Sequence, residues 1–254
     1  MGLELWFPRV PSMRVFQQAR FHLRASWHKE DRTLSRHGFS VRDFAKRFPS
    51  AQERWYVMAK LATDPLYPAV HEVIQTTTTP LLDVGCGMGV LAFYLSQRGW
   101  LPTITGVDCD SRKIATARRL AAGFGGTLKF LQGDAATTLP AHCGSVTALD
   151  ILQYFAPDAR DAVLRQCAAR VADNGVLVIR TGLMDATRRF RVTRFVDRMA
   201  ALLNWTITAP VHYPDSDELC AVLTGAGLTG EFKPLWGRTP FNNWLGVFRR
   251  TTQH

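Results

Sequence analysis

The chain has 254 residues, a hydrophobic content of 46% and a net charge of +10, so it can bury a full core and attract a polyanionic partner. Its five cysteines are odd in number, scattered and without a CxxC pair, which argues against disulfides or a metal site and favours a reducing cytoplasm. Neither a secretory signal nor a run of ~18 apolar residues is present, so we expect no export and no membrane span.

Residues 1–79 predict a helical N-terminal appendage, because aromatic and basic residues recur there at irregular helical spacing without any strand-like run. Ser50 followed by Glu53 forms a capping-box pattern, which predicts that a helix begins there. The prolines at 65 and 68 predict that this helix ends and a second one begins before residue 80.

From residue 80 onward, short apolar runs alternate with helical patterns, which predicts βαβ units and a parallel sheet covered on both faces. The runs are 80–85, 102–108, 127–133, 145–152 and 175–182. Two more runs, 230–237 and 241–250, are separated by a turn too short for a parallel crossover, so they predict an antiparallel pair. The chain is therefore predicted to be α/β, with one large domain over 80–254.

The first strand leads into a glycine loop, LLDVGCGMG, with Asp83 at its start and Gly85, Gly87 and Gly89 within it. Such a loop brings bare backbone to the carboxyl end of the sheet, where α/β folds bind ligands. The GxGxG spacing, followed by Val90, departs from the dinucleotide pattern GxGxxG, and the loop has no lysine for a phosphate-binding P-loop.

The loop resembles the first motif of class I S-adenosylmethionine (SAM) dependent methyltransferases, and four further motifs follow in that family's order. The resemblance implies a Rossmann-like, seven-stranded, mostly parallel sheet with a reversed last strand. It also implies that Asp108 binds the ribose hydroxyls, that Asp134 and Ala135 address the adenine, and that 150–155 flanks the methionyl end and faces the acceptor. The implied SAM-binding residues are Asp83, Gly85, Cys86, Gly87, Gly89, Asp108, Cys109, Asp134, Ala135, Asp150 and Leu152.

Simpler roles stay open for some of these residues. Asp83 could serve only to orient the loop, and Asp108 could cap the following helix, although Asp110 is the better placed cap. Cys86 and Cys109 have no basic neighbour in sequence, so they suit packing better than nucleophilic chemistry.

Candidate catalytic residues lie on the acceptor side. The fourth motif reads DILQ and lacks an Asn-Pro-Pro-aromatic tetrad, so transfer to a nucleobase or amide nitrogen by that route is not expected. Gln153 cannot act as a base, which shifts attention to His212, since histidine titrates near neutral pH. His212 could equally be an ordinary loop residue, and Tyr154 is expected to form a wall of the acceptor pocket.

Residues 185–207 combine basic and apolar side chains at helical spacing, which is compatible with a lid over an apolar or anionic acceptor or with a helix packed on the sheet. The basic members are Arg188, Arg189, Arg191, Arg194 and Arg198, and the apolar ones are Phe190, Phe195, Met199, Leu202 and Leu203.

A narrower likeness concerns LATDPLYPAV and PLWGRTPFNNWLGVFRR, which look like methyltransferases of bacterial aryl-polyene and related fatty-acid-like pigment pathways. It implies a small phenolic or lipid-like acceptor, methylated on oxygen or carbon and carried on an acyl carrier protein. The positive charge would suit an acidic carrier or an anionic membrane surface. Oligomeric state is left open.

Two other classes remain. An RNA methyltransferase would use the basic N-terminal residues with Phe16, Phe21, Trp27 and Phe44 as stacking groups, but no RNA-binding module is recognisable, so nucleic acid is the less favoured partner. A catalytically silent SAM-binding scaffold would keep the glycine loop and lack an open acceptor pocket.

Overall fold

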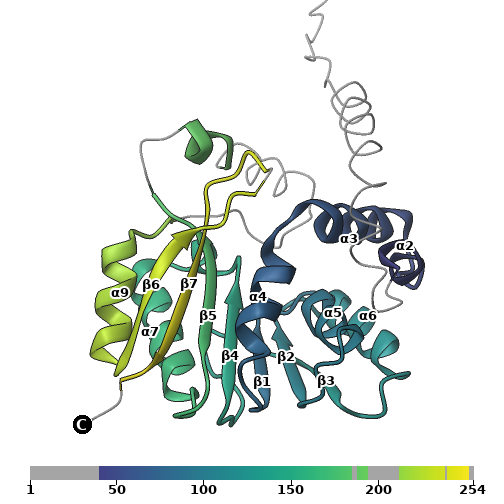
Figure 1. Cartoon of the computed structure of the whole chain (residues 1–254), viewed down its shortest axis with the longest axis horizontal. Coiled ribbons are helices and arrows are strands. Elements are labelled where there is room, and N and C mark those ends of the chain that lie inside the picture. Colours follow the sequence, from purple (N-terminus) through teal and green to yellow (C-terminus); the bar gives the residue numbers. More distant parts are fainter. Residues whose placement is uncertain (1–39, 185–187, 194–211, 238, 252–254) are drawn as a thin grey trace, which may run out of the picture.

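The computed structural model describes residues 40–184, 188–193, 212–237 and 239–251, and a seven-stranded sheet forms its centre (Figure 1). The strands are β1 Leu81–Val84, β2 Ile104–Asp108, β3 Leu128–Gln132, β4 Ser145–Leu149, β5 Leu177–Gly182, β6 Leu228–Pro234 and β7 Asn243–Arg250. Their order is β3-β2-β1-β4-β5-β7-β6; β1 to β5 are parallel, and β7 is antiparallel to both β5 and β6. The predicted α/β fold with a reversed last strand is confirmed.

Helices cover both faces of this sheet (Figure 1). They are α2 Val41–Ala45, α3 Ala51–Thr63, α4 Leu66–Ile74, α5 Val90–Gln97, α6 Ser111–Ala121, α7 Pro157–Ala169 and α9 Ser216–Gly225, with a 3-10 turn, η2, at Leu152–Tyr154. The apolar side chains of α4, α5 and α6 share one hydrophobic cluster, and those of α7 and α9 belong to a second. Within the described ranges, no helix is both long and apolar enough to cross a membrane.

The central strands supply both clusters because successive side chains in a strand point to opposite faces. Leu81 packs with α4 and α5, whereas Leu82 packs with α7. In the same way Val178 joins the first cluster, while Leu177 and Ile179 join the second. All five side chains are fully buried, which explains why these strands read as continuous apolar runs in the sequence.

The N-terminal helices are part of this core as far as the structure describes them. The Ser50 hydroxyl accepts from the backbone N–H of Glu53 at 3.1 Å, and the Glu53 carboxylate accepts from the Ser50 N–H at 2.9 Å, so the predicted capping box starts α3. Val57 of α3 and Val70 of α4 are fully buried in the same cluster as α5. The domain boundary at residue 79 stays a prediction.

One of the four aromatic residues named for the RNA alternative is not available to nucleic acid. Phe44 is only 4% exposed and its ring lies 5.4 Å from Phe48 and 5.8 Å from Phe93, centroid to centroid. Phe44 therefore could not serve as a stacking group in the less favoured RNA alternative, because its ring packs α2 on α5. The other three residues named for that alternative, Phe16, Phe21 and Trp27, lie outside the described residues.

Candidate active site

The glycine loop joins β1 to α5 at the carboxyl edge of the sheet. Gly85, Gly87 and Gly89 have φ values of 75°, 55° and 77°, in the left-handed region that favours glycine. A Cβ on Gly85 would lie 2.1 Å from the Ile151 side chain, whereas one on Gly87 would meet nothing within 4 Å. The loop therefore packs closely against the β4 side at Gly85 and presents bare backbone to open space at Gly87.

Asp108, at the end of β2, is tied to this loop. Its Oδ2 accepts from the Gly87 N–H at 2.8 Å and its Oδ1 accepts from the Asp110 N–H at 2.8 Å. Asp110 is the N-cap of α6, since its Oδ1 accepts from the Arg112 N–H at 3.0 Å. The structure thus separates the two roles that the sequence left open: Asp110 caps the helix, and Asp108 faces the glycine loop.

The third strand brings the predicted adenine-binding residues beside Asp108. The Gly133 N–H donates to the Asp108 carbonyl at 3.1 Å, and the next two residues are Asp134, which is exposed, and Ala135, which is half-buried. Asp134 Oδ1 accepts from the Ala136 N–H at 2.9 Å, which fixes the turn. Carboxylates therefore lie at or just beyond the carboxyl ends of both β2 and β3, and their oxygens can accept hydrogen bonds from ribose hydroxyls and from an adenine amino group.

Asp83 lies beneath the loop rather than facing its open side. Its side chain is 2% exposed, and the Thr147 hydroxyl of β4 donates to its Oδ1 at 2.7 Å. Burial raises the pKa of Asp83 to about 7, and the nearby Asp108 charge adds to this, while the bond from Thr147 opposes it. Asp83 joins β1 to β4 and so supports the loop from below.

The two cysteines of the motifs show no sign of nucleophilic character. Cys86 is buried and Cys109 is exposed, and neither takes part in a disulfide. Burial raises the pKa of both thiols, and the carboxylate of Asp108 adds to that effect, so the thiolate form is disfavoured at each position. A packing role for Cys86 agrees with its contact to Gly106, where an added Cβ would lie 2.7 Å from the sulfur.

The segment after β4 turns sharply at Asp150, whose φ is 59°. The Leu152 side chain is fully buried in the cluster with α7, so only its backbone faces the site. Gln153 is 6% exposed; its Nε2 donates to the Asp150 carbonyl at 3.0 Å, and its Oε1 has no hydrogen-bond partner among the described residues. This amide oxygen is therefore a buried acceptor whose hydrogen bond is unmade within the described part of the chain. Tyr154, next in sequence, is half-buried.

His212 lies against this segment. Its backbone N–H donates to the Gln153 carbonyl at 3.2 Å, and its side chain is exposed. The structure therefore brings His212 and Tyr154, the two predicted catalytic residues, to neighbouring positions although they are far apart in sequence.

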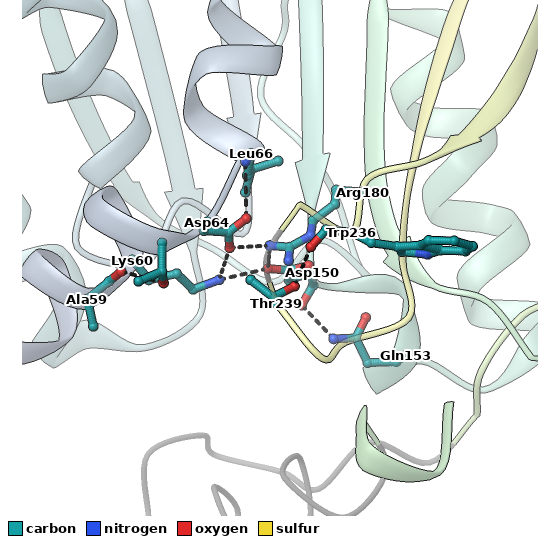
Figure 2. A network of polar contacts seen from close by, with 10 residues as sticks. Ala59, Lys60, Asp64, Leu66, Asp150, Gln153, Arg180, Trp236 and Thr239 are labelled. Carbon is teal, nitrogen blue, oxygen red and sulfur yellow. Dashed lines mark hydrogen bonds and ion pairs between the residues drawn. The ribbon is translucent and has the colours of Figure 1, made fainter. Parts of the chain in front are cut away.

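Sequence reasoning missed a charged network at the ends of β4 and β5. Figure 2 shows four side chains that point toward one another, Lys60 and Asp64 from the end of α3, Asp150, and Arg180 of β5. Arg180 Nη1 donates to Asp150 Oδ2 at 2.6 Å and to Asp64 Oδ2 at 3.0 Å. Lys60 Nζ donates to the same two atoms at 3.3 Å and 3.0 Å. A signal did exist, because a lone arginine inside an apolar parallel strand needs a buried carboxylate partner.

Only the first part of the expected lid segment is described. Residues 188–193 are helical, and Phe190 is buried with its ring 5.0 Å from that of Tyr213. The Arg189 guanidinium lies 4.9 Å from the ring centroid of Trp236 in the turn between β6 and β7. This part of the segment packs on neighbouring elements. The rest lies outside the described residues, including Arg194, Phe195, Arg198, Met199, Leu202 and Leu203.

The fold and the glycine loop are similar to those of known methyltransferases. Residues 81–175 match the family model described as a methyltransferase domain. The ubiquinone biosynthesis O-methyltransferase of Pseudomonas fluorescens (strain Pf0-1) is 30% identical over 115 residues, which are 44% of this chain and 48% of that protein. The chain spans about half the length of the curated relatives it matches.

Solved structures share the fold at low identity. Magnesium protoporphyrin IX methyltransferase from Synechocystis, with bound S-adenosylhomocysteine (SAH), has a TM-score of 0.59 at 15% identity, over 80% of this chain and 89% of that one. An O-methyltransferase from neocarzinostatin biosynthesis, in complex with SAH and 1,4-dihydroxy-2-naphthoic acid, has a TM-score of 0.54 at 19% identity, over 77% and 55%.

Proposed function

We propose that the chain transfers the methyl group of SAM to a hydroxyl oxygen of a small phenolic acceptor. Its main support is the glycine loop, where left-handed backbone beside Asp108 leaves open space above Gly87. The curated relatives are named O-methyltransferases, and the neocarzinostatin enzyme was solved with a dihydroxynaphthoic acid. These likenesses favour oxygen over carbon as the methylated atom.

Within this proposal, the chain's own residues hold donor and acceptor in line and exclude water. SAM supplies a methyl group already activated by its sulfonium, so such positioning can account for up to ~7–11 kcal/mol of the barrier. Asp108 would hold the ribose, Asp134 and Ala135 the adenine, and the segment from Asp150 to Leu152 the methionyl end. The backbone from 85 to 89, including Cys86, would line the donor, with Cys109 beside it.

A phenol must lose its proton during transfer, and His212 would take it as general base. Support comes from the position of His212 beside Gln153, whose amide cannot act as a base. Tyr154, half-buried and adjacent, would form a wall of the acceptor pocket.

The finer identity of the acceptor is also a proposal. The likeness to aryl-polyene pathway methyltransferases supports a phenolic or lipid-like group, and the net charge of +10 supports delivery on an acidic acyl carrier protein or at an anionic membrane surface. Such partners would be recognised by complementary charge more than by shape.

Methyl-labelled SAM tests the acceptor class. Purified chain is incubated with 1,4-dihydroxy-2-naphthoate as a probe phenol and, separately, with a lysate of the source cells, and the products are divided into solvent-extractable and acid-precipitable fractions. Label in the extract, identified as a methyl ether by mass spectrometry, is the expected result. Precipitable label that alkali releases as a small molecule would support a carrier-bound acceptor, and label destroyed by ribonuclease would overturn the proposal. An Asp108→Ala chain serves as the inactive control.

A further inference from the structure

We propose, building on the proposed function, that Arg180 is a positioning residue for methyl transfer. It would act through Asp150 on the acceptor-facing segment 150–154, and Lys60 and Asp64 would link α3 to the same segment. None of the four charged side chains needs to touch the reacting atoms for this role.

The first support is the backbone of Asp150. Among the described residues it is the only one other than glycine with a positive φ, a conformation that L-residues adopt at a cost. Arg180 holds it twice: its carbonyl accepts from the Asp150 N–H at 2.8 Å, and its guanidinium binds the Asp150 carboxylate. The end of β5 thus stabilises the strained turn at the end of β4.

The second support is the series of contacts that leads from this turn to the predicted base. The Asp150 carbonyl accepts from Gln153 Nε2 at 3.0 Å, and the Gln153 carbonyl accepts from the His212 N–H at 3.2 Å. A shift of Asp150 would therefore displace both Gln153 and His212. Small displacements of this kind are costly in catalysis, since misplacement by ~1 Å can reduce a rate ~100-fold.

The third support is the electrostatic balance of the network. Arg180 is 2% exposed and Asp64 is 7% exposed, whereas the side chains of Lys60 and Asp150 are 24% and 34% exposed. Burial alone would raise the pKa of Asp64, but the charges of Lys60 and Arg180 outweigh it and hold that pKa below its usual value. Two cations thus neutralise two carboxylates, and removal of any one leaves an uncompensated charge in a buried setting.

The fourth support is the connection to α3 and α4. Asp64 Oδ1 accepts from the Leu66 N–H at 3.1 Å, so the same side chain that binds Arg180 also fixes the junction between the two helices. Pro65 in this junction packs against the β6–β7 turn, where an added Cβ on Gly237 would lie 2.9 Å from the proline ring. The N-terminal helices are therefore coupled to the acceptor side of the site.

The test compares Arg180→Met, Arg180→Lys and Asp64→Asn with a matched control, Arg160→Met. Arg160 is also a buried arginine, 4% exposed, but it pairs with Asp161 and Glu218 and joins α7 to α9. Three quantities are measured: hydrogen exchange of residues 150–155, SAH affinity by calorimetry, and turnover with 1,4-dihydroxy-2-naphthoate. Unfolding curves allow all comparisons to be made at matched stability.

We expect exchange in 150–155 to rise and turnover to fall, each at least ~10-fold, in Arg180→Met and Asp64→Asn. SAH affinity should fall less than turnover, because the glycine loop and Asp108 are untouched. Arg180→Lys should recover part of both effects, since an ammonium can still pair with Asp150, but the shorter lysine side chain is less able to reach both Asp150 and Asp64 as Arg180 Nη1 does. If Arg180→Met fails to fold, the other two variants carry the test.

A purely structural role for Arg180 would give variants that match Arg160→Met in exchange and turnover at equal stability, and this result would overturn the proposal. Failure of the proposed function would give a different result: the wild-type chain itself would then transfer no methyl group to any phenol. Loss confined to the variants and loss in the wild type are therefore distinguishable.

Discussion

The site has a donor half, formed by the glycine loop and Asp108, and an acceptor half, formed by residues 150–154 and His212. Different interactions stabilise each half. In the donor half, backbone N–H groups of adjacent loops bind Asp108, and the sheet places β1, β2 and β3 side by side. In the acceptor half, ion pairs join residues 90 and 116 positions apart, Lys60 to Asp150 and Asp64 to Arg180. The donor half therefore depends on local backbone conformation, whereas the acceptor half depends on ion pairs between residues far apart in the sequence.

The largest expected effect is in the donor half, at Gly85. Gly85→Ala would force a left-handed conformation on an L-residue and place its Cβ 2.1 Å from the Ile151 side chain. The two costs together can reach about 5 kcal/mol of unfolding free energy. Urea unfolding measures the loss.

Gly87→Ala is the matched control for that substitution. Its φ of 55° carries the same backbone cost, but its Cβ would meet nothing, so we expect a loss of only about 1–2 kcal/mol. The added methyl would nevertheless occupy the open space above the loop and weaken SAM binding. Equal stability losses in the two variants would contradict the packing assigned to Gly85.

The next largest effect is the pH dependence caused by Asp83. Its pKa is about 7 in the folded chain and about 3.9 when unfolded, so between these values the folded state holds more protons and stability falls as pH rises. At about 1.4 kcal/mol per pKa unit, the loss approaches about 4 kcal/mol by pH 7 to 8. Asp83→Asn keeps an acceptor for Thr147 and removes this dependence. The unfolding free energies of the wild-type chain and of Asp83→Asn are compared from pH 4 to 8. If both change with pH in the same way, the assignment is refuted.

Asp108→Ala should reduce SAM affinity by at least about 3 kcal/mol, since a carboxylate makes two charge-assisted hydrogen bonds to the ribose in this assignment. The chain should remain folded, because Asp108 is half-buried at the edge of the sheet. Calorimetry with SAM gives the affinity. Asp110→Ala provides the contrast: it removes the N-cap of α6, at about 1 kcal/mol of stability, and should leave SAM affinity unchanged. Unchanged affinity in Asp108→Ala would remove the ribose assignment.

The difference between the halves also explains what the sequence could predict. The strands, the glycine loop and the Ser50 cap have local signals, which are short apolar runs, a fixed glycine spacing and a polar residue three positions before its partner. The reversed last strand followed from a turn too short for a crossover. Even the separate tasks of Asp108 and Asp110 could be anticipated from their positions at a strand end and a helix start.

In the acceptor half, the lone arginine of an apolar strand indicates that a carboxylate partner exists but not which residue it is. Asp64 reads as part of a helix break before Pro65, and only the fold shows that it meets Arg180, because the partner of a buried charge can come from any segment that the topology brings near. The role of Phe44 was open for a related reason: an aromatic residue between basic ones gives the same sequence pattern whether it stacks on RNA or, as the structure shows, packs on Phe93.

The smallest of these effects, and the one that most sharpens the contrast between the halves, concerns His212. If it is the base, His212→Ala should lower turnover near pH 7 about 100-fold, or about 2.7 kcal/mol, while SAM affinity holds, because the donor half does not involve this residue. The deficit should shrink as the pH approaches ~10, where a phenol ionises unaided. A deficit that is constant with pH would mean that His212 only supports Gln153 through its backbone contact, and equal turnover in both chains would exclude it as the base.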